Sequence, residues 1–349
     1  MAAKLVSLVV AALVLQPARA LALPRGTEVQ TYQGNLSFPV DMAWVPRTDK
    51  IFFTEKNTGR IRVLVGRRLL ARPCADLDVN PAGERGALGI ALHPDFARNK
   101  RLYVYFTNRA PLDNRVVRFT VRANRCRDKR VIVKGMSASS SGYHNGGQLE
   151  FVGRYLFVAT GEAHQPAQAQ DTSNRLGKIL RYNANGTVPE DNPFGADNPV
   201  WSYGHRNPFG LARKPGTQLL YSTENGPQCD DELNIIRRAR NYGWGPGYDC
   251  GTAGVGENPK GPLVRWSDII VPTDPWWYRG RIDALSGDLY VGAFGDGSLH
   301  RIVTSNGGTR LVRDRVIHRD ADGIVDVSKG PGGWLYYLTP NAIKRIVES

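Results

Sequence analysis

The sequence lacks a hydrophobic run long enough to cross a bilayer. Its most apolar stretch, residues 5–15, is shorter than the roughly 20 residues that a membrane helix needs. Lys4 precedes this stretch and Ala18-Arg19-Ala20 follows it, in the order of charged start, apolar centre and small-residue cleavage site typical of a secretory signal peptide. We therefore expect residues 1–20 to be a signal peptide rather than a buried strand, with cleavage after Ala22 as a variant. The mature protein is then periplasmic or secreted.

Cysteine is scarce, and its spacing argues against a zinc site. The four cysteines are Cys74, Cys126, Cys229 and Cys250, and no C-x-x-C pair occurs. An even number in an oxidising compartment favours disulfides, with free buried thiols as the alternative. Of the three possible connectivities we expect Cys229–Cys250, which flank one loop-rich segment, and by elimination Cys74–Cys126.

Acidic residues are too few to balance the basic ones. The net charge is +14, and removal of Lys4 and Arg19 with the signal peptide leaves +12 (14 − 2). Such a surplus is compatible with nucleic acid or an anionic membrane as partner. The basic residues are spread along the chain in short pairs such as Arg67-Arg68, however, so we expect a solvated basic surface and no nucleic-acid site. A general attraction to anionic cell-envelope polymers is compatible with this surface.

Helical periodicity is also scarce after the signal peptide, which excludes a parallel α/β fold because that fold needs helical crossovers. A different unit recurs: a turn residue, an apolar-aromatic strand, a polar gap and a second strand. Six copies over the 329 mature residues (349 − 20) give one unit per roughly 55 residues, within the range of a propeller blade with insertions. The first strands of the six units contain Ile51, Leu102, Tyr155, Leu219, Leu289 and Leu335.

This recurrence predicts an all-β fold, a six-bladed β-propeller with four-stranded antiparallel blades around a central channel. Residues 21–349 would form this single domain. A β-sandwich accounts for short strands but not for six repeats in a chain of this length. The longest gaps fall between the third, fourth and fifth units, and we expect the functional insertions there.

Three loops carry side chains suited to chemistry. His144 precedes two glycines in YHNGGQLEF (143–151), and a histidine on such a rigid turn can take a proton near neutral pH, although a lone histidine is more often structural. Arg206 and Asn207 offer a cation and an amide beside a proline. The segment ENGPQCDDE (224–232) combines a bend with three consecutive carboxylates, oxygen ligands that suit calcium, although acidic runs are often only solvated loops.

Together these segments resemble the soluble pyrroloquinoline-quinone (PQQ) sugar dehydrogenases of the glucose/sorbosone type, including the aldose sugar dehydrogenases. The resemblance runs from about Phe38 to Ile346. Its matching segments, in order, are GERGALGIALHPDF (83–96), the His-Asn-Gly-Gly motif, GKILR (177–181), NGTVP (185–189), DNPF (191–194), HRNP (205–208), DELN (231–234) and NYGW (241–244).

The resemblance implies a role for each matched residue. His144 would be the general base that removes the proton of the sugar C1 hydroxyl while hydride passes to PQQ. Glu162 would support it in place of the aspartate usual in the family. Arg206 and Asn207 would contact the quinone oxygens, and Glu84 would lie near substrate and cofactor.

The resemblance also implies two calcium sites and two partners. The carbonyls of Gly226 and Pro227 would hold the calcium that polarises PQQ. Asp231, Glu232 and Tyr242 match a second, structural calcium site. The partners would be a small sugar and an electron acceptor.

Three cations of the family are missing. Gly295 stands where a lysine pairs with PQQ, and Gly323 and Val325 stand where two arginines hold its carboxylates. PQQ is a tricarboxylate, and three lost charge-assisted hydrogen bonds would weaken its binding by roughly 4.5–9 kcal/mol if nothing replaced them. The candidate replacements on neighbouring loops are Arg279, Arg281, Arg319 and Lys329.

Three functions remain open at this point. The first is a PQQ- and calcium-dependent oxidoreductase that converts aldoses to lactones. The second is a propeller that has lost PQQ and binds a carbohydrate or a protein in a calcium-stabilised pocket. The third, a calcium-dependent lactonase, rests on analogy with other six-bladed propellers alone.

Overall fold

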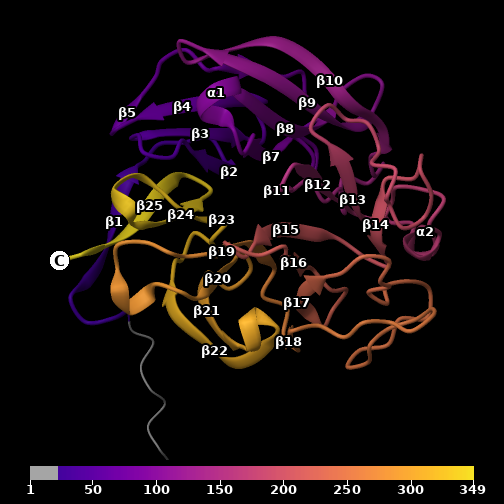
Figure 1. Ribbon diagram of the computed structural model, residues 1–349. Coiled ribbons are helices and arrows are strands. Elements are labelled where there is room, and N and C mark those ends of the chain that lie inside the picture. Colours follow the sequence, from indigo (N-terminus) through magenta and orange to yellow (C-terminus); the bar gives the residue numbers. More distant parts are fainter. Residues whose placement is uncertain (1–22) are drawn as a thin grey trace, which may run out of the picture.

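Twenty-five strands in residues 23–349, the part that this computed structural model describes, form six sheets around a common centre (Figure 1). The prediction of a six-bladed β-propeller is confirmed. The expected signal peptide, residues 1–20, lies outside the described residues. None of the helices in the described part is long and apolar enough to span a membrane.

Each blade is an antiparallel sheet whose innermost strand is packed against the innermost strands of its neighbours. Blades 1 to 3 comprise, from the centre outward, β2 (Pro39–Trp44), β3 (Lys50–Glu55), β4 (Arg60–Val65) and β5 (Arg68–Leu69); β7 (Ala87–Leu92), β8 (Arg101–Asn108), β9 (Asp113–Arg122) and β10 (Arg125–Ser137); and β11 (Leu149–Val152), β12 (Tyr155–Thr160), β13 (Lys178–Asn183) and β14 (Val200–Tyr203).

Blades 4 to 6 follow the same order. They comprise β15 (Pro208–Arg213), β16 (Leu220–Glu224), β17 (Asp231–Ile236) and β18 (Val264–Trp266); β19 (Pro272–Trp277), β20 (Leu289–Ala293), β21 (Ser298–Ser305) and β22 (Arg310–Arg319); and β23 (Asp326–Lys329), β24 (Leu335–Thr339), β25 (Ala342–Glu348) and β1 (Thr27–Gln33). The helices are short: α1 (Phe96–Asn99), α2 (Pro166–Gln170) and 3-10 turns at Asp283–Leu285, Asn306–Gly308 and Pro331–Gly333.

The two strands of each sequence repeat are the second and third strands of a blade, for example β3 with β4 and β24 with β25. Adjacent blades cover both faces of these strands. Phe52, Tyr103 and Tyr290 on them are fully buried. Because both faces of the second strand are buried, this strand carries apolar and aromatic residues in every blade, which is why it marks the repeat in the sequence.

The ring is closed by a strand that the repeat does not contain. Strand β1 pairs with β25 so that Thr27 faces Glu348 and Val29 faces Ile346. The first and last described strands therefore lie in one sheet, indigo beside yellow in Figure 1. Blade 1 departs from the four-stranded pattern, because a short fifth strand, β6 (Ala75–Asp76), also pairs with β4.

Both expected disulfides are confirmed. Cys74–Cys126 joins the end of blade 1 to the outer strand β10 of blade 2. Cys229–Cys250 joins the β16–β17 bend to the long β17–β18 loop. Among the described residues no cysteine is free.

The antiparallel order of the blades decides which loops share a face. Connections between blades and connections between second and third strands leave at the same end of the strands, whereas the remaining connections leave at the opposite end. His144 and Arg206 lie on connections between blades, and Glu162 lies between β12 and β13. These side chains therefore reach one face of the propeller although they are far apart in sequence.

Three buried aspartates tie the inner strands together inside the channel. Asp41 on β2, Asp274 on β19 and Asp326 on β23 place carboxylate oxygens within 4.8 Å of one another. Each accepts a backbone hydrogen bond from a neighbouring blade; for example, Met42 N–H donates to Asp326 Oδ2 at 3.0 Å. Burial raises the pKa of Asp41 to about 7 and the pKa values of the other two well above the usual range.

Asp41→Asn is expected to flatten the pH dependence of stability. An unfolded aspartate ionises near pH 4, so a folded pKa of about 7 contributes stability that is complete below pH 4 and is lost as the pH rises through 7. Each such group changes the unfolding free energy by about 1.4 kcal/mol per pH unit in that window. Urea unfolding at pH 5, 6 and 7 measures the slope. Equal slopes for the wild type and the variant would show that Asp41 stays ionised.

Candidate active site

A cavity of about 480 Å³ opens on the face that collects the inter-blade connections. This is within the size range of small-molecule sites. Of the residues predicted for the site, six line it, namely Glu84, His144, Arg206, Asn207, Gly226 and Asp231. Glu162 lies directly behind His144, whereas Pro227, Glu232 and Tyr242 do not line the cavity.

His144 and Glu162 form a buried pair. Nδ1 of His144 contacts Oε1 of Glu162, whose side chain is only 1% exposed. A carboxylate at Nδ1 holds the proton there and leaves the lone pair on Nε2. The backbone of His144 is left-handed, with φ of 56°, and this turn presents the ring to the cavity. The arrangement is that of an oriented general base.

Glu84 and Asn207 brace this turn. Oε2 of Glu84 accepts hydrogen bonds from the backbone N–H of His144 at 2.7 Å and from Nδ2 of Asn207 at 3.1 Å. Oδ1 of Asn207 in turn accepts the N–H of Gly146 at 3.1 Å. Loops from three blades are therefore linked through two side chains, which holds the base in a fixed position.

Arg206 lies next to Asn207 on the β14–β15 connection and lines the same cavity. Its Nη1 donates to the carbonyl of Asn225 at 2.9 Å, and its guanidinium lies 5.3 Å from the ring centroid of Trp244. Its backbone N–H donates to Glu224, whose other carboxylate oxygen contacts His205 at 2.8 Å. Contacts with Glu224, Asn225 and Trp244 thus hold Arg206 in place, and its guanidinium lines the cavity.

Several buried polar atoms around this cavity have no hydrogen-bond partner among the described residues. They include Nε of Arg206, Oδ1 of Asn225 and Oε2 of Glu162. Unpaired buried polar groups are costly, and they are expected where a ligand or water completes the site. The polar side of the cavity is therefore built for a polar ligand.

The bend after β16 offers oxygen ligands for a cation. Within the described residues the carbonyls of Gly226 and Pro227 accept no hydrogen bond. The Asp231 carboxylate lines the same cavity; it accepts the N–H of Gly226 at 2.8 Å and the N–H groups of Ile270 and Val271. Burial raises the pKa of Asp231. Free carbonyls beside a carboxylate are suitable ligands for calcium.

The residues of the second predicted calcium site do not meet at this cavity. Glu232 follows Asp231 on β17 and therefore points to the other face, where Asn234 donates to it at 3.0 Å and Arg265 lies 3.7 Å away. Burial raises the pKa of Glu232 to about 8. The hydroxyl of Tyr242 donates to the carbonyl of Ile235 at 2.5 Å. The second calcium site stays a prediction.

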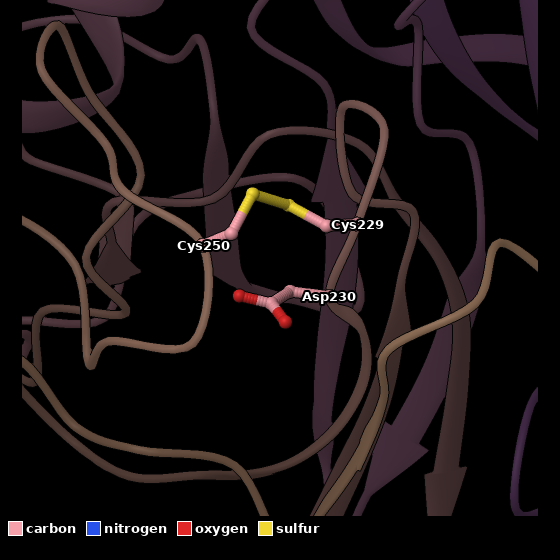
Figure 2. Close-up of side chains that lie close together, drawn as sticks. All are labelled: Cys229, Asp230 and Cys250. Carbon is pink, nitrogen blue, oxygen red and sulfur yellow. A yellow bond between two sulfur atoms is a disulfide. The ribbon is translucent and has the colours of Figure 1, made fainter.

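Cys229, Asp230 and Cys250 lie close together but do not form a metal site with thiolate ligands, because the two sulfurs are bonded to each other. Figure 2 shows Asp230 beside the bonded sulfur atoms. Oδ2 of Asp230 accepts hydrogen bonds from the hydroxyl of Tyr248 at 2.9 Å and from the N–H of Gly251. The sulfurs are consumed by the disulfide, and the carboxylate anchors the loop.

The opposite wall of the cavity was missed by sequence reasoning. It is apolar and comes from blades 1, 5 and 6. Its residues lie at or near strand ends that are far apart in sequence, so the wall could be recognised only once the topology showed that these ends meet on the cavity face. The wall comprises Phe38, Val40, Ile269, Val271, Phe294 and Val325.

None of the proposed replacement cations lines this cavity. Arg279 and Lys329 line a separate cavity of about 440 Å³ at the other end of the channel. Arg281 stacks on Trp334, and Arg319 pairs with Asp296 at the surface. The cation that sequence reasoning overlooked is Lys56, which lines the cavity after β3.

The cavity fits one end of PQQ and calcium better than the other. The unpaired Nε–H of Arg206 suits a quinone oxygen. The unpaired Oδ1 of Asn225 is an acceptor and suits calcium, as do the carbonyl of Gly226 and, next to the cavity, the carbonyl of Pro227. Gly323 and Val325 themselves offer no cation for a carboxylate, and the lysine beside this wall is Lys56, whose Nζ lies 5.6 Å from the Phe38 ring centroid. The residues present thus fit an ortho-quinone and a calcium ion, but not a full set of three carboxylates.

Comparisons with known proteins give the family. The sequence model of the glucose/sorbosone dehydrogenase family matches residues 36–348. An aldose sugar dehydrogenase of Escherichia coli (strain K12) is 31% identical over 354 residues, which cover 94% of each chain. A quinoprotein glucose dehydrogenase B of Acinetobacter calcoaceticus is 33% identical over 243 residues, which cover 60% of this chain and 50% of that protein.

Solved structures agree with this assignment. The PQQ-bound form of an aldose sugar dehydrogenase from Streptomyces coelicolor has a TM-score of 0.80 and 27% identity, covering 93% of this chain and 99% of that one. A putative oxidoreductase (glucose dehydrogenase) of Thermus thermophilus has a TM-score of 0.82 and 34% identity, covering 92% of this chain and all of that one. The chain belongs to the glucose/sorbosone dehydrogenase family.

Proposed function

We propose that this protein is an exported oxidoreductase that oxidises the C1 hydroxyl of aldose sugars to lactones with a PQQ-type quinone and calcium. One observation carries the proposal: the His144–Glu162 pair and Arg206 face the same cavity, and buried polar atoms around it lack partners among the described residues. The family relationship supports sugar oxidation as the reaction class.

His144 would take the proton of the C1 hydroxyl on Nε2. The sugar loses that proton and a hydride from C1, so a C1=O bond forms and the ring becomes a lactone. A bound quinone supplies the two-electron acceptor in this chemistry, and an external electron acceptor then reoxidises it. Glu162 stabilises the imidazolium that forms, because its carboxylate contacts Nδ1.

Arg206 and Asn207 would stabilise negative charge on the oxygens of the bound quinone. A cation held in place by Asn225 and Trp244 needs no reorganisation when charge develops, and this is the arrangement that lowers a barrier most. The carbonyls of Gly226 and Pro227 would hold calcium beside it. Glu84 would position His144 and Asn207 rather than react.

Export rests on the N-terminal signal pattern and is supported by the two disulfides. The alternative function is a propeller that has lost PQQ and binds a carbohydrate or protein in the same cavity. The specific observation that favours it is the apolar wall where the family has cations. The lactonase function has no observation of its own in its favour.

The test is isothermal titration of PQQ into the calcium-loaded mature protein, with dye reduction measured for a panel of aldoses. We expect saturable binding and sugar-dependent reduction. Methyl glycosides of the same sugars are the matched control, because their C1 oxygen carries no proton. Reduction that is equal with the methyl glycosides, or absent although quinone is bound, would refute aldose oxidation and point to the binding function.

A further inference from the structure

The cavity has two walls of opposite character. The blade 2–4 wall carries Glu84, His144, Arg206 and Asn207. The blade 5–6 and blade 1 wall is mostly hydrocarbon; its polar side chains are Thr273 and Lys56, whose Nζ lies 5.6 Å from the Phe38 ring centroid. Three of the six large hydrophobic side chains that are exposed in the described chain surround this one opening: Tyr143 is 50% exposed, Phe294 40% and Ile269 39%. Exposed apolar side chains gathered at one cavity mark a ligand surface.

The space beside Gly323 is filled by an aromatic side chain and is not empty. A side chain at Gly323 would place its Cβ 2.8 Å from Cδ2 of Phe294, and the backbone there has φ of +82°. The Phe294 ring therefore fills the space in which a residue at 323 would extend. It lies 6.3 Å from the ring of Phe38, and Val325 lines the same wall.

The charges that line the cavity cancel. Lys56 and Arg206 are the two lysine or arginine residues on it, and Glu84 and Asp231 are the two carboxylates (2 − 2 = 0). Lys56 also donates to Asn57 at 2.8 Å and to the carbonyl of Pro81 at 3.2 Å. A calcium ion at the Gly226 bend would add two positive charges, one fewer than the negative charges of three carboxylates. A tricarboxylate would therefore lose hydration here without a full set of matching cations, which is unfavourable.

We propose that this cavity binds a planar aromatic ligand of low charge, with its ortho-quinone oxygens toward Arg206 and its ring system on the apolar wall. Aromatic rings and branched aliphatic side chains favour flat, uncharged rings. The inference rests on the proposed function for the identity of the quinone end. It goes beyond that function because it assigns the charge class of the ligand.

The test compares three quinones on the calcium-loaded protein: PQQ, its trimethyl ester, and the neutral tricyclic 1,10-phenanthroline-5,6-dione. Dissociation constants are measured by quenching of tryptophan fluorescence, without sugar. We expect the trimethyl ester to bind at least as tightly as PQQ. Tighter binding of PQQ than of its ester, or no binding of any of the three, overturns the proposal.

A pair of variants tests whether the apolar wall determines the relative affinities for PQQ and its trimethyl ester. Phe294→Lys adds a cation at the cavity mouth and is expected to tighten PQQ binding about tenfold and to leave the ester unchanged. Val312→Lys adds the same charge at a 57% exposed site on β22 outside the cavity and is expected to change neither. Equal effects of the two variants on PQQ would contradict a specific role for the wall.

The binding and activity measurements distinguish a wrong ligand charge class from a wrong dehydrogenase reaction. If PQQ binds more tightly than its ester and sugar is still oxidised, only the charge assignment is wrong. If the ester or the dione binds as expected but no aldose is oxidised with any bound quinone, the ligand class stands and the dehydrogenase proposal falls.

Discussion

His144→Gln is expected to lower kcat for aldose oxidation by about 10²–10⁴-fold. Glutamine is close to histidine in size and can donate to Glu162, but it cannot accept a proton at the cavity. The Glu84 contact to the backbone N–H at 144 does not depend on the side chain and should hold the turn in place. Steady-state dye reduction under saturating quinone measures the effect.

The control for this variant is a histidine on the other face. His93 follows β7, so it lies at the opposite end of the strands from His144, and it contacts Tyr103 and Phe151. His93→Gln should leave kcat within about twofold of wild type, a change too small to implicate it in proton transfer. Quinone affinity of His144→Gln should also stay unchanged. Activity retained by His144→Gln would remove this residue from the mechanism.

Loss of the Cys74–Cys126 disulfide is expected to cost about 4 kcal/mol of unfolding free energy. The bridge closes a separation of 52 residues, and the chain-entropy estimate for a loop of that length gives this magnitude. Cys74 is 1% exposed in the core between blades 1 and 2, so both cysteines should be replaced by alanine to avoid a buried free thiol. Urea unfolding of Cys74→Ala/Cys126→Ala measures the loss.

The second bridge provides an internal comparison. Cys229–Cys250 spans 21 residues, which gives about 3 kcal/mol on the same estimate. It anchors loops beside the Gly226 bend, so its removal should also weaken calcium affinity, whereas removal of Cys74–Cys126 should not. A loss below about 1 kcal/mol for the longer loop would mean that blade packing alone holds blades 1 and 2 together.

Much of the fold could be predicted from sequence because each blade repeats one local pattern. The second strand of each blade is buried on both faces and therefore carries apolar and aromatic residues in every copy, as at Phe52 and Tyr290. Strand β1 was not predicted, because its pairing with β25 is a contact between residues at the two ends of the chain. The aspartates at 41, 274 and 326 were also missed, since each stands alone in its own strand and they meet only inside the ring.

The candidate site also has a part that could be predicted from the sequence and a part that could not. His144, Arg206 and Asn207 stand in motifs that are recognisable locally, and the structure brings them to one cavity. The absent cations at Gly323 and Val325 were visible in the sequence, but what occupies their place was not. The expected replacements failed for a topological reason: Arg279 and Lys329 lie at the other end of the strands, facing the second cavity.

The sequence by itself determined the repeat, the disulfide-forming cysteines, the family and the polar half of the site, because these depend on residue types within short segments. Only the tertiary structure decided how the ring closes, which loops share a face, and that Phe294 lies over Gly323 to make an apolar wall. Those features depend on the direction in which each strand runs and on contacts between blades. No single segment of the sequence determines the strand directions or the contacts between blades, because both are set when six sheets pack around one axis.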